Sequence, residues 1–155
     1  MLLSFGDHYF DTGKASLKPE MVHILEKAVP AYSQSLFEDP KIADKISSVE
    51  IIGFASPTYQ GRYIDPMTLK AEDRAAVNFN MKLSQERANA IYDRIFDTGH
   101  MTFRHQQQLL PLVKVSGRSF HAESRRDVAS GTARGFCHKN DCAKAQRVVI
   151  KFSLK

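Results

Sequence analysis

The sequence contains no apolar run of the length that a membrane-spanning helix needs. Its longest apolar stretches, such as Val148 to Phe152 and Leu109 to Val113, fall far short of the roughly 20 residues required. The first residues also lack the basic region, apolar run and small-residue cleavage site of a secretion signal. We therefore expect a soluble domain whose export signal or membrane anchor lies upstream of Met1.

Motifs for catalysis are missing as well. The sequence has no Gly-x-Ser-x-Gly elbow, no His-Glu-x-x-His pair and no glycine-rich phosphate loop. An enzyme would need a nucleophile with an oriented base, or a pair of acids. We expect a protein that is not an enzyme and that needs no cofactor.

Cysteine is scarce, since only Cys137 and Cys142 are present. Although His138 lies between them, a structural zinc site needs four ligands, and no other histidine stands at ligand spacing. A short loop could instead bring the two thiols together. We predict a disulfide and no metal site, which would indicate an oxidising compartment.

What is present is typical of one globular domain: 155 residues, of which 43% are hydrophobic and 25% charged. The net charge of +5 favours acidic partners, such as nucleic acid, anionic lipid or the carboxylate-rich peptides of a bacterial wall. The basic residues are scattered and no aromatic-rich RNA-binding motif occurs, so nucleic acid is the weaker candidate.

The first half of the chain predicts a strand, a helix and a second strand. Alternating apolar residues indicate a strand within Leu2 to Phe10, and a β-branched run indicates another at Ser47 to Gly53. Between them, apolar residues recur every three or four positions from Pro19 to Leu36, which predicts a helix. Pro30 should kink or interrupt this helix.

The second half predicts one more helix and two strands. Ser84 is placed as the N-cap of a helix that ends at Gly99, with Glu86 in its first turn. The strands are expected at Leu109 to Val115 and at Arg147 to Leu154. The predicted fold is a two-layer α/β (α+β) sandwich of order β-α-β-α-β-β, with a mixed four-stranded sheet and helices mainly on one face.

Four sequence segments carry a resemblance to a known family. They are Phe10-Asp11-x-Gly13-x-Ala15-x-Leu17-x-Pro19, Val49-Glu50-Ile51-Ile52-Gly53-Phe54-Ala55-Ser56, Asn80-x-x-Leu83-Ser84-x-x-Arg87-Ala88 and Asp141-Cys142-x-x-x-Gln146-Arg147-Val148-Val149-Ile150. In this order and spacing they resemble the OmpA/MotB-type C-terminal peptidoglycan-binding domain family. The resemblance covers nearly the whole of 1–155 as a single domain, with an insertion at about 57–79, part of which, Leu69 to Val77, could be helical.

The resemblance implies a periplasmic domain that holds peptidoglycan without catalysis and anchors a larger envelope or motor-stator protein, with homodimerisation as a further possibility. Its groove would bind the diaminopimelate residue of a stem peptide. The guanidinium group of Arg87 would donate paired hydrogen bonds to the ligand carboxylate. Asn80 would fix a neighbouring polar group, and Arg147 would border the binding side. Backbone donors near Ser84 would add to an anion pocket.

The sequence departs from the family at Ser56, where relatives usually carry an aspartate. A carboxylate from the insertion, at Asp65, Glu72 or Asp73, is one candidate to replace the missing charge. The alternative is a domain that has lost peptidoglycan binding and serves as a dimerisation or scaffolding module. In the simpler interpretations of single residues, Arg87 is a solvated charge, Arg147 an exposed cross-strand partner and Ser56 a strand-end hydroxyl.

Overall fold

A computed structural model describes residues 2–6, 10–11, 13–65, 67–118 and 147–155 of the chain. Its elements, in chain order, are β1 (Leu2–Gly6), α1 (Pro19–Phe37), α2 (Pro40–Ala43), β2 (Ile46–Phe54), β3 (Thr58–Tyr59), β4 (Arg62–Tyr63), the 3-10 helix η2 (Ala71–Asp73), α3 (Arg74–Phe96), α4 (Gln106–Leu109), the 3-10 helix η3 (Leu110–Leu112), β5 (Val113–Gly117) and β6 (Arg147–Leu154). No helix in these ranges is long and apolar enough to span a membrane.

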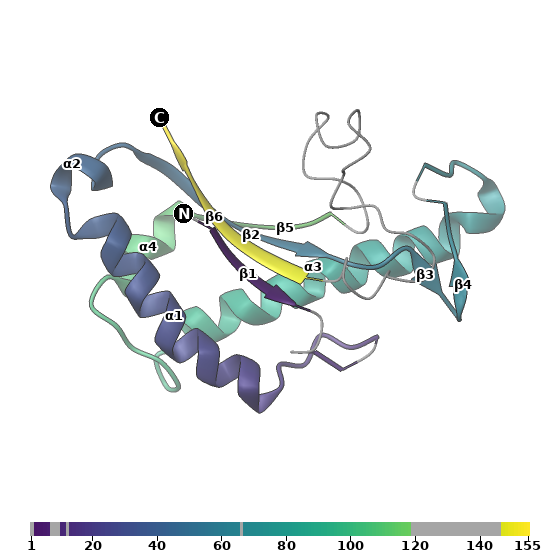
Figure 1. Ribbon diagram of the computed structural model, residues 1–155, viewed down its shortest axis with the longest axis horizontal. Helices are drawn as coiled ribbons and strands as arrows, with labels where there is room; N and C mark the ends of the chain where they lie inside the picture. The colour runs from purple at the N-terminus through teal and green to yellow at the C-terminus, as the bar shows by residue number, and fades with distance from the viewer. Residues whose placement is uncertain (1, 7–9, 12, 66, 119–146) are drawn as a thin grey trace.

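Four strands form one mixed sheet in the order β1-β6-β2-β5 (Figure 1). β6 runs antiparallel to both of its neighbours, whereas β2 and β5 are parallel. β1 and β2 therefore point the same way on either side of β6, and α1 connects them; α3 connects β2 to β5. The predicted α+β fold with a mixed four-stranded sheet is confirmed.

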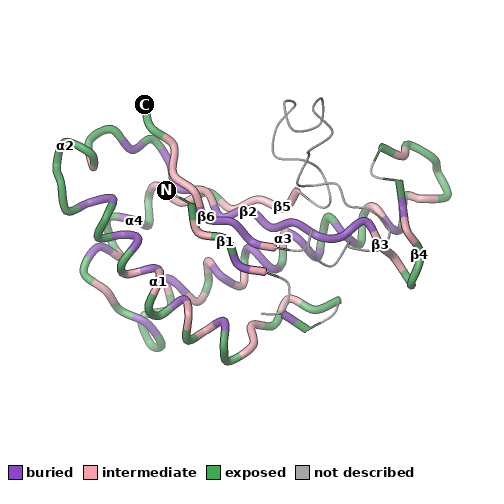
Figure 2. Tube along the Cα trace, viewed as in Figure 1, coloured by how far each residue is buried: buried purple, intermediate pink, exposed green. Residues whose placement is uncertain are grey.

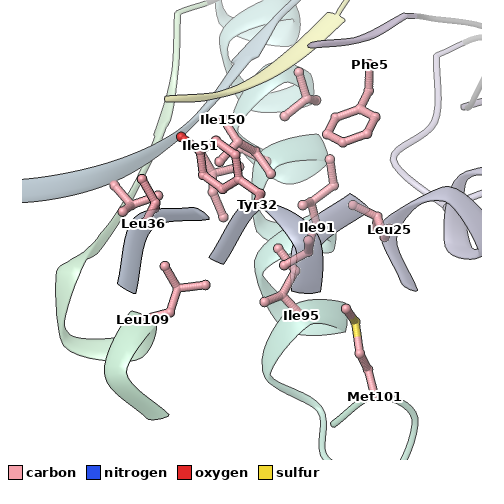
Figure 3. Close-up of a cluster of buried hydrophobic side chains, with 14 of the residues drawn as sticks. Phe5, Leu25, Tyr32, Leu36, Ile51, Ile91, Ile95, Met101, Leu109 and Ile150 are labelled. Atoms are coloured by element: carbon pink, nitrogen blue, oxygen red, sulfur yellow. The ribbon is translucent and has the colours of Figure 1, made fainter. Parts of the chain in front are cut away.

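The main core lies between this sheet and the helices α1 and α3 (Figures 1 and 3). Alternation along the strands directs Val49 and Ile51 of β2, with Val148 and Ile150 of β6, into this core. Figure 3 shows Leu25 and Ile91, from the two helices, in the same cluster as Ile51 and Ile150. The buried stretches of the tube in Figure 2 accordingly run along the central strands and along one side of each long helix.

The opposite face of the sheet carries a smaller apolar cluster and a charged pair. Ile52, Phe54 and Val149 form the cluster. Glu50 and Lys151 stand opposite each other in the register of β2 and β6, and their carboxylate and ammonium groups are 3.8 Å apart. Such a partly exposed cross-strand pair contributes little to stability.

Several expectations about element boundaries are wrong, among them an interruption of α1 at Pro30, a helix that ends at Gly99 where α3 ends at Phe96, and a strand from Leu109 where β5 begins only at Val113. α1 continues without interruption through Pro30, because a single proline removes only one helical hydrogen bond and the apolar face on both sides of it stays buried. α3 begins at Arg74, so Ser84 is not its N-cap and Glu86 is not in its first turn. The predicted pocket of backbone donors at Ser84 therefore does not exist, since donors inside a helix are already bonded.

The segment expected as an inserted loop with a possible helix at 69–77 contains a hairpin as well as helical structure. β3 and β4 form a two-stranded hairpin whose turn residues, Gln60 and Gly61, both have positive φ, at 50° and 76°. This is the backbone of a tight turn that favours glycine. η2 and the first turns of α3 follow this hairpin.

Cys137 and Cys142 lie outside the described residues, so the disulfide stays a prediction.

Candidate functional site

The strand ends beside α3 are fixed by two close backbone approaches. A Cβ atom on Gly53 would lie 2.0 Å from the carbonyl oxygen of Ser84, and one on Gly117 would lie 2.5 Å from the amide nitrogen of Gln85. Only glycine fits at such distances. The Gly117 amide also donates to Oε1 of Gln85 over 2.7 Å. These contacts hold the residues that follow β2 against the N-terminal half of α3.

A cavity of about 300 Å³ opens at this end of β2. Its lining comes from the hairpin β3–β4, the N-terminal half of α3 and the turn at Gly13. Its lining consists of Gly13, Ser56, Thr58, Tyr59, Gln60, Gly61, Phe79, Asn80 and Leu83. Two of the predicted site residues, Ser56 and Asn80, are thus brought together, and none of these described lining residues is charged.

Asn80 links the helix to the hairpin across one side of the cavity. Its side chain is only 3% exposed, and Nδ2 donates to the carbonyl oxygens of Thr58, at 3.0 Å, and Ala76, at 3.2 Å. Because both partners are acceptors, the orientation of the amide group is determined. Within the part of the chain that the structure describes, Oδ1 accepts no hydrogen bond, so it remains an acceptor for a ligand.

Ser56 is buried at the start of the hairpin. Its Oγ is 2.8 Å from Oγ1 of Thr58, and its carbonyl accepts the Thr58 amide at the same distance. Both hydroxyls can donate as well as accept. Together with Asn80 they make a small polar side of the cavity that carries no net charge.

Arg87 lies where the sequence did not place it. Instead of an exposed helix start, it occupies the middle of α3 and is 1% exposed. Nε donates to the carbonyl of Lys14 at 3.0 Å, Nη2 donates to that of Asp11 at 3.3 Å, and the guanidinium lies 5.0 Å from the centre of the Phe10 ring. Arg87 does not line the cavity but holds the turn that carries Gly13, which does.

Arg147 is also apart from the cavity lining. It begins β6, opposite Phe54 in the register with β2, and its guanidinium lies 4.2 Å from the centre of the Phe54 ring. Such stacking of a cation on an aromatic face is favourable and leaves the side chain partly exposed. The structure therefore places Arg147 on the face of the sheet away from the main core.

The three acidic residues of the insertion do not reach the cavity. Asp65 accepts the backbone amide of Met67 at 2.9 Å, and Asp73 accepts the hydroxyl of Thr68 at 2.5 Å. Both carboxylates thus stabilise local turns ahead of α3, and Glu72 is exposed. No described carboxylate of the insertion replaces the aspartate that Ser56 lacks.

The aromatic side of the cavity was not predicted from the sequence. Tyr59 and Phe79 both line it, with ring centres 5.4 Å apart and planes tilted by 58°. Their separation in sequence conceals the pair, which forms only because the Gln60–Gly61 turn folds the hairpin back beside α3. The one available signal in the sequence was the dipeptide Gln60-Gly61, because a polar residue followed by glycine is typical of a hairpin turn.

Comparison with solved structures decides the fold. The OmpA-like domain of FopA1 from Francisella tularensis subsp. tularensis SCHU S4 matches 99% of this chain and 73% of its own, with a TM-score of 0.50 and 22% identity. The chain has the OmpA-like fold. The periplasmic domain of Helicobacter pylori MotB (residues 90–256) matches 99% of this chain and 74% of its own, with a TM-score of 0.53 and 14% identity. No protein-family model and no curated protein matches the sequence.

At these identities the likeness concerns the fold alone. It confirms the OmpA/MotB-type architecture that the four sequence segments indicated. The roles of individual residues in the OmpA-like fold of this chain rest on its own geometry.

Proposed function

We propose that this domain binds peptidoglycan without catalysis and anchors a larger envelope protein to the cell wall in the periplasm. The observation that carries the proposal is the cavity at the end of β2, lined by Ser56 and Asn80, in a chain with the OmpA-like fold. The resemblance of the sequence places the peptide-binding groove at this strand end. One solved structure with this fold is a periplasmic domain, which supports the location.

The polar side of the cavity suits the ammonium group of a diaminopimelate side chain. Oδ1 of Asn80 and the hydroxyl of Ser56 are acceptors for it. Arg87, which does not line the cavity, holds the Gly13 turn and supplies a positive charge that favours the ligand carboxylate. Arg147 would border the binding side from its position on Phe54.

The proposal is tested by calorimetric titration of a diaminopimelate-containing muropeptide into the wild-type domain and the Ser56→Asp variant at constant salt. The new carboxylate adds a charge-assisted hydrogen bond to the ligand ammonium, so affinity should rise about tenfold. No insertion carboxylate lies in the cavity to repel it. Ser47→Asp, on an exposed position at the other end of β2, is the matched control and should change nothing.

If the wild-type domain does not bind the muropeptide, the proposed peptidoglycan-binding function is wrong. Equal affinities of wild type and Ser56→Asp would show that Ser56 does not face the ligand.

A dimerisation or scaffolding role is the second candidate, and one observation favours it. Met67 and Leu69, in the segment between the hairpin and η2, are 67% and 90% exposed. Apolar side chains in such positions are common at contacts between proteins. Sedimentation of the wild type and of a Met67→Ser, Leu69→Ser variant separates the candidates, because only a dimer held by this segment would dissociate.

A further inference from the structure

The cavity has two chemically different sides. Ser56, Thr58 and Asn80 form the polar side described above, whereas Tyr59, Phe79 and Leu83 form an apolar side. Phe79 is 43% exposed although it is a large apolar residue on a helix, and it packs against Tyr59 of the hairpin. The apolar side is therefore built from two segments, and it is open to a ligand.

The apolar side is aromatic and carries no charge. Gln60, at the tip of the hairpin turn, adds an exposed amide that can both donate and accept hydrogen bonds. Aromatic rings present an electron-rich face that attracts polarised C–H bonds. A pyranose ring has such C–H bonds on one face and hydroxyl groups around its rim, so it matches an aromatic pair beside a side-chain amide.

A charged peptide end matches this side poorly. Desolvating an ionised group against Tyr59 and Phe79 would cost free energy, because none of the described lining residues offers an opposite charge. A neutral sugar avoids this cost and still buries its apolar face. The two sides thus favour different parts of one ligand that contains both a peptide and a sugar.

We propose that Tyr59 and Phe79, with Gln60, form a sugar-binding subsite that contacts the glycan strand of peptidoglycan next to the stem-peptide cavity. The inference rests on the proposed function, since it adds a second contact to the same bound polymer. The subsite belongs to the hairpin and the first turns of α3, the region that corresponds to the insertion expected from the sequence. With this subsite the domain would recognise the sugar of peptidoglycan as well as its peptide.

The test compares two probes by calorimetry at constant salt. One is a stem peptide that contains diaminopimelate; the other is the same peptide attached to its N-acetylglucosamine–N-acetylmuramic acid disaccharide. The wild type should bind the disaccharide peptide more tightly. Phe79→Ala should weaken binding of the disaccharide peptide by roughly fivefold and leave the sugar-free peptide unchanged. Phe79→Tyr, which keeps the ring, should retain the wild-type preference.

Met81→Ala is the matched control, because Met81 is 37% exposed on the same helix and does not line the cavity. It should change neither affinity. Equal wild-type affinity for the two probes, or an equal loss for both in Phe79→Ala, would overturn the sugar subsite while the stem-peptide function stands. Binding of the disaccharide peptide without any binding of the free peptide would leave the subsite in place and overturn the diaminopimelate assignment. Binding of neither probe would overturn both.

Discussion

The two halves of α3 are held in the molecule by different kinds of interaction. The C-terminal half buries Ala88, Ile91 and Ile95 against the sheet and α1. The preceding part, from Arg74 to Arg87 and called the N-terminal half below, also has a buried face, but there the polar side chains of Asn80, Ser84 and Arg87 lie beside Ala76 and Leu83. Apolar packing fixes one half, and hydrogen bonds to the hairpin, the strand ends and the Gly13 turn fix the other.

This difference separates stability from binding within a single helix. Apolar packing is not directional and tolerates small shifts, so it suits a core whose only task is to stay folded. Hydrogen bonds fix donor and acceptor positions within tenths of an ångström, which a binding cavity requires. We therefore expect substitutions in the C-terminal half to lower the free energy of unfolding alone, and those in the N-terminal half to lower ligand affinity as well.

The largest effect is expected for Ile91→Ala in the C-terminal half. Ile91 has no exposed surface, so truncation leaves a void between α3, α1 and the sheet and should lower the free energy of unfolding by about 4 kcal/mol. Urea denaturation followed by circular dichroism measures this loss. Leu69→Ala, at a 90% exposed position, should have no effect on stability. Muropeptide affinity of the folded Ile91→Ala variant should match the wild type, and a large loss would contradict the division of α3.

The second largest effect is expected for Arg87→Ala, which should lower both the free energy of unfolding and the affinity for peptidoglycan. It removes the donors for the carbonyls of Asp11 and Lys14 and empties the space beside Phe10, so we expect a loss of about 3 kcal/mol in the free energy of unfolding. Peptidoglycan pull-down should also weaken, because the turn with Gly13 is released. Arg74→Ala, an exposed position at the start of the same helix, is the control. A fully stable Arg87→Ala variant would show that the turn is held by other contacts.

The sequence predicted one half of α3 and missed the other for the same reason. Helical periodicity is recognised from apolar residues, and Ala88, Ile91 and Ile95 supply it in the C-terminal half. In the N-terminal half polar Asn80 and Ser84 share the buried face with Ala76 and Leu83, so the apolar periodicity is weak. The sequence therefore indicated only a possible helix at 69–77 and placed the start of the main helix at Ser84. Regular alternation predicted β6 with its observed bounds, whereas the strand expected from Leu109 begins only at Val113.

The candidate site was predicted only in part. Ser56 and Asn80 were found because they stand in segments with a family pattern, and the structure places both on one cavity. Burial of Arg87 could not be foreseen, since it depends on carbonyl groups more than seventy positions away in the sequence. The pairing of Tyr59 with Phe79 depends in the same way on a hairpin turn that local sequence indicates only weakly.

The pH dependence of the free energy of unfolding tests the burial of Tyr32 in the apolar core. Burial raises the pKa of Tyr32 from 10.0 to about 12. In the unfolded chain the phenol ionises near pH 10, whereas the folded state resists ionisation, so stability is intact below pH 10 and falls as pH rises toward 12. The loss at the upper limit is about 2 to 3 kcal/mol. Tyr32→Phe should remove this part of the alkaline destabilisation, as measured by urea unfolding at pH 9 and pH 11.5.

The smallest change in stability is expected for Asn80→Ala in the N-terminal half. Asn80 connects α3 to Thr58 through one hydrogen bond, and the carbonyl that loses its donor borders a cavity open to solvent, so water can replace the amide. We expect a loss of about 1 kcal/mol in the free energy of unfolding. The free energy of ligand binding should fall by more than this, because the variant loses both the hydrogen bond that positions the hairpin and the acceptor Oδ1.

Two measurements separate these effects. Hydrogen exchange at the Ile64 amide, which donates to the Pro57 carbonyl within the hairpin segment, reports the loosening of the hairpin, and muropeptide titration reports the loss of affinity. Asn78→Ala, at an exposed position two residues earlier, is the matched control. An Asn80→Ala variant that bound the muropeptide as tightly as the wild type would show that the polar half of α3 serves stability alone.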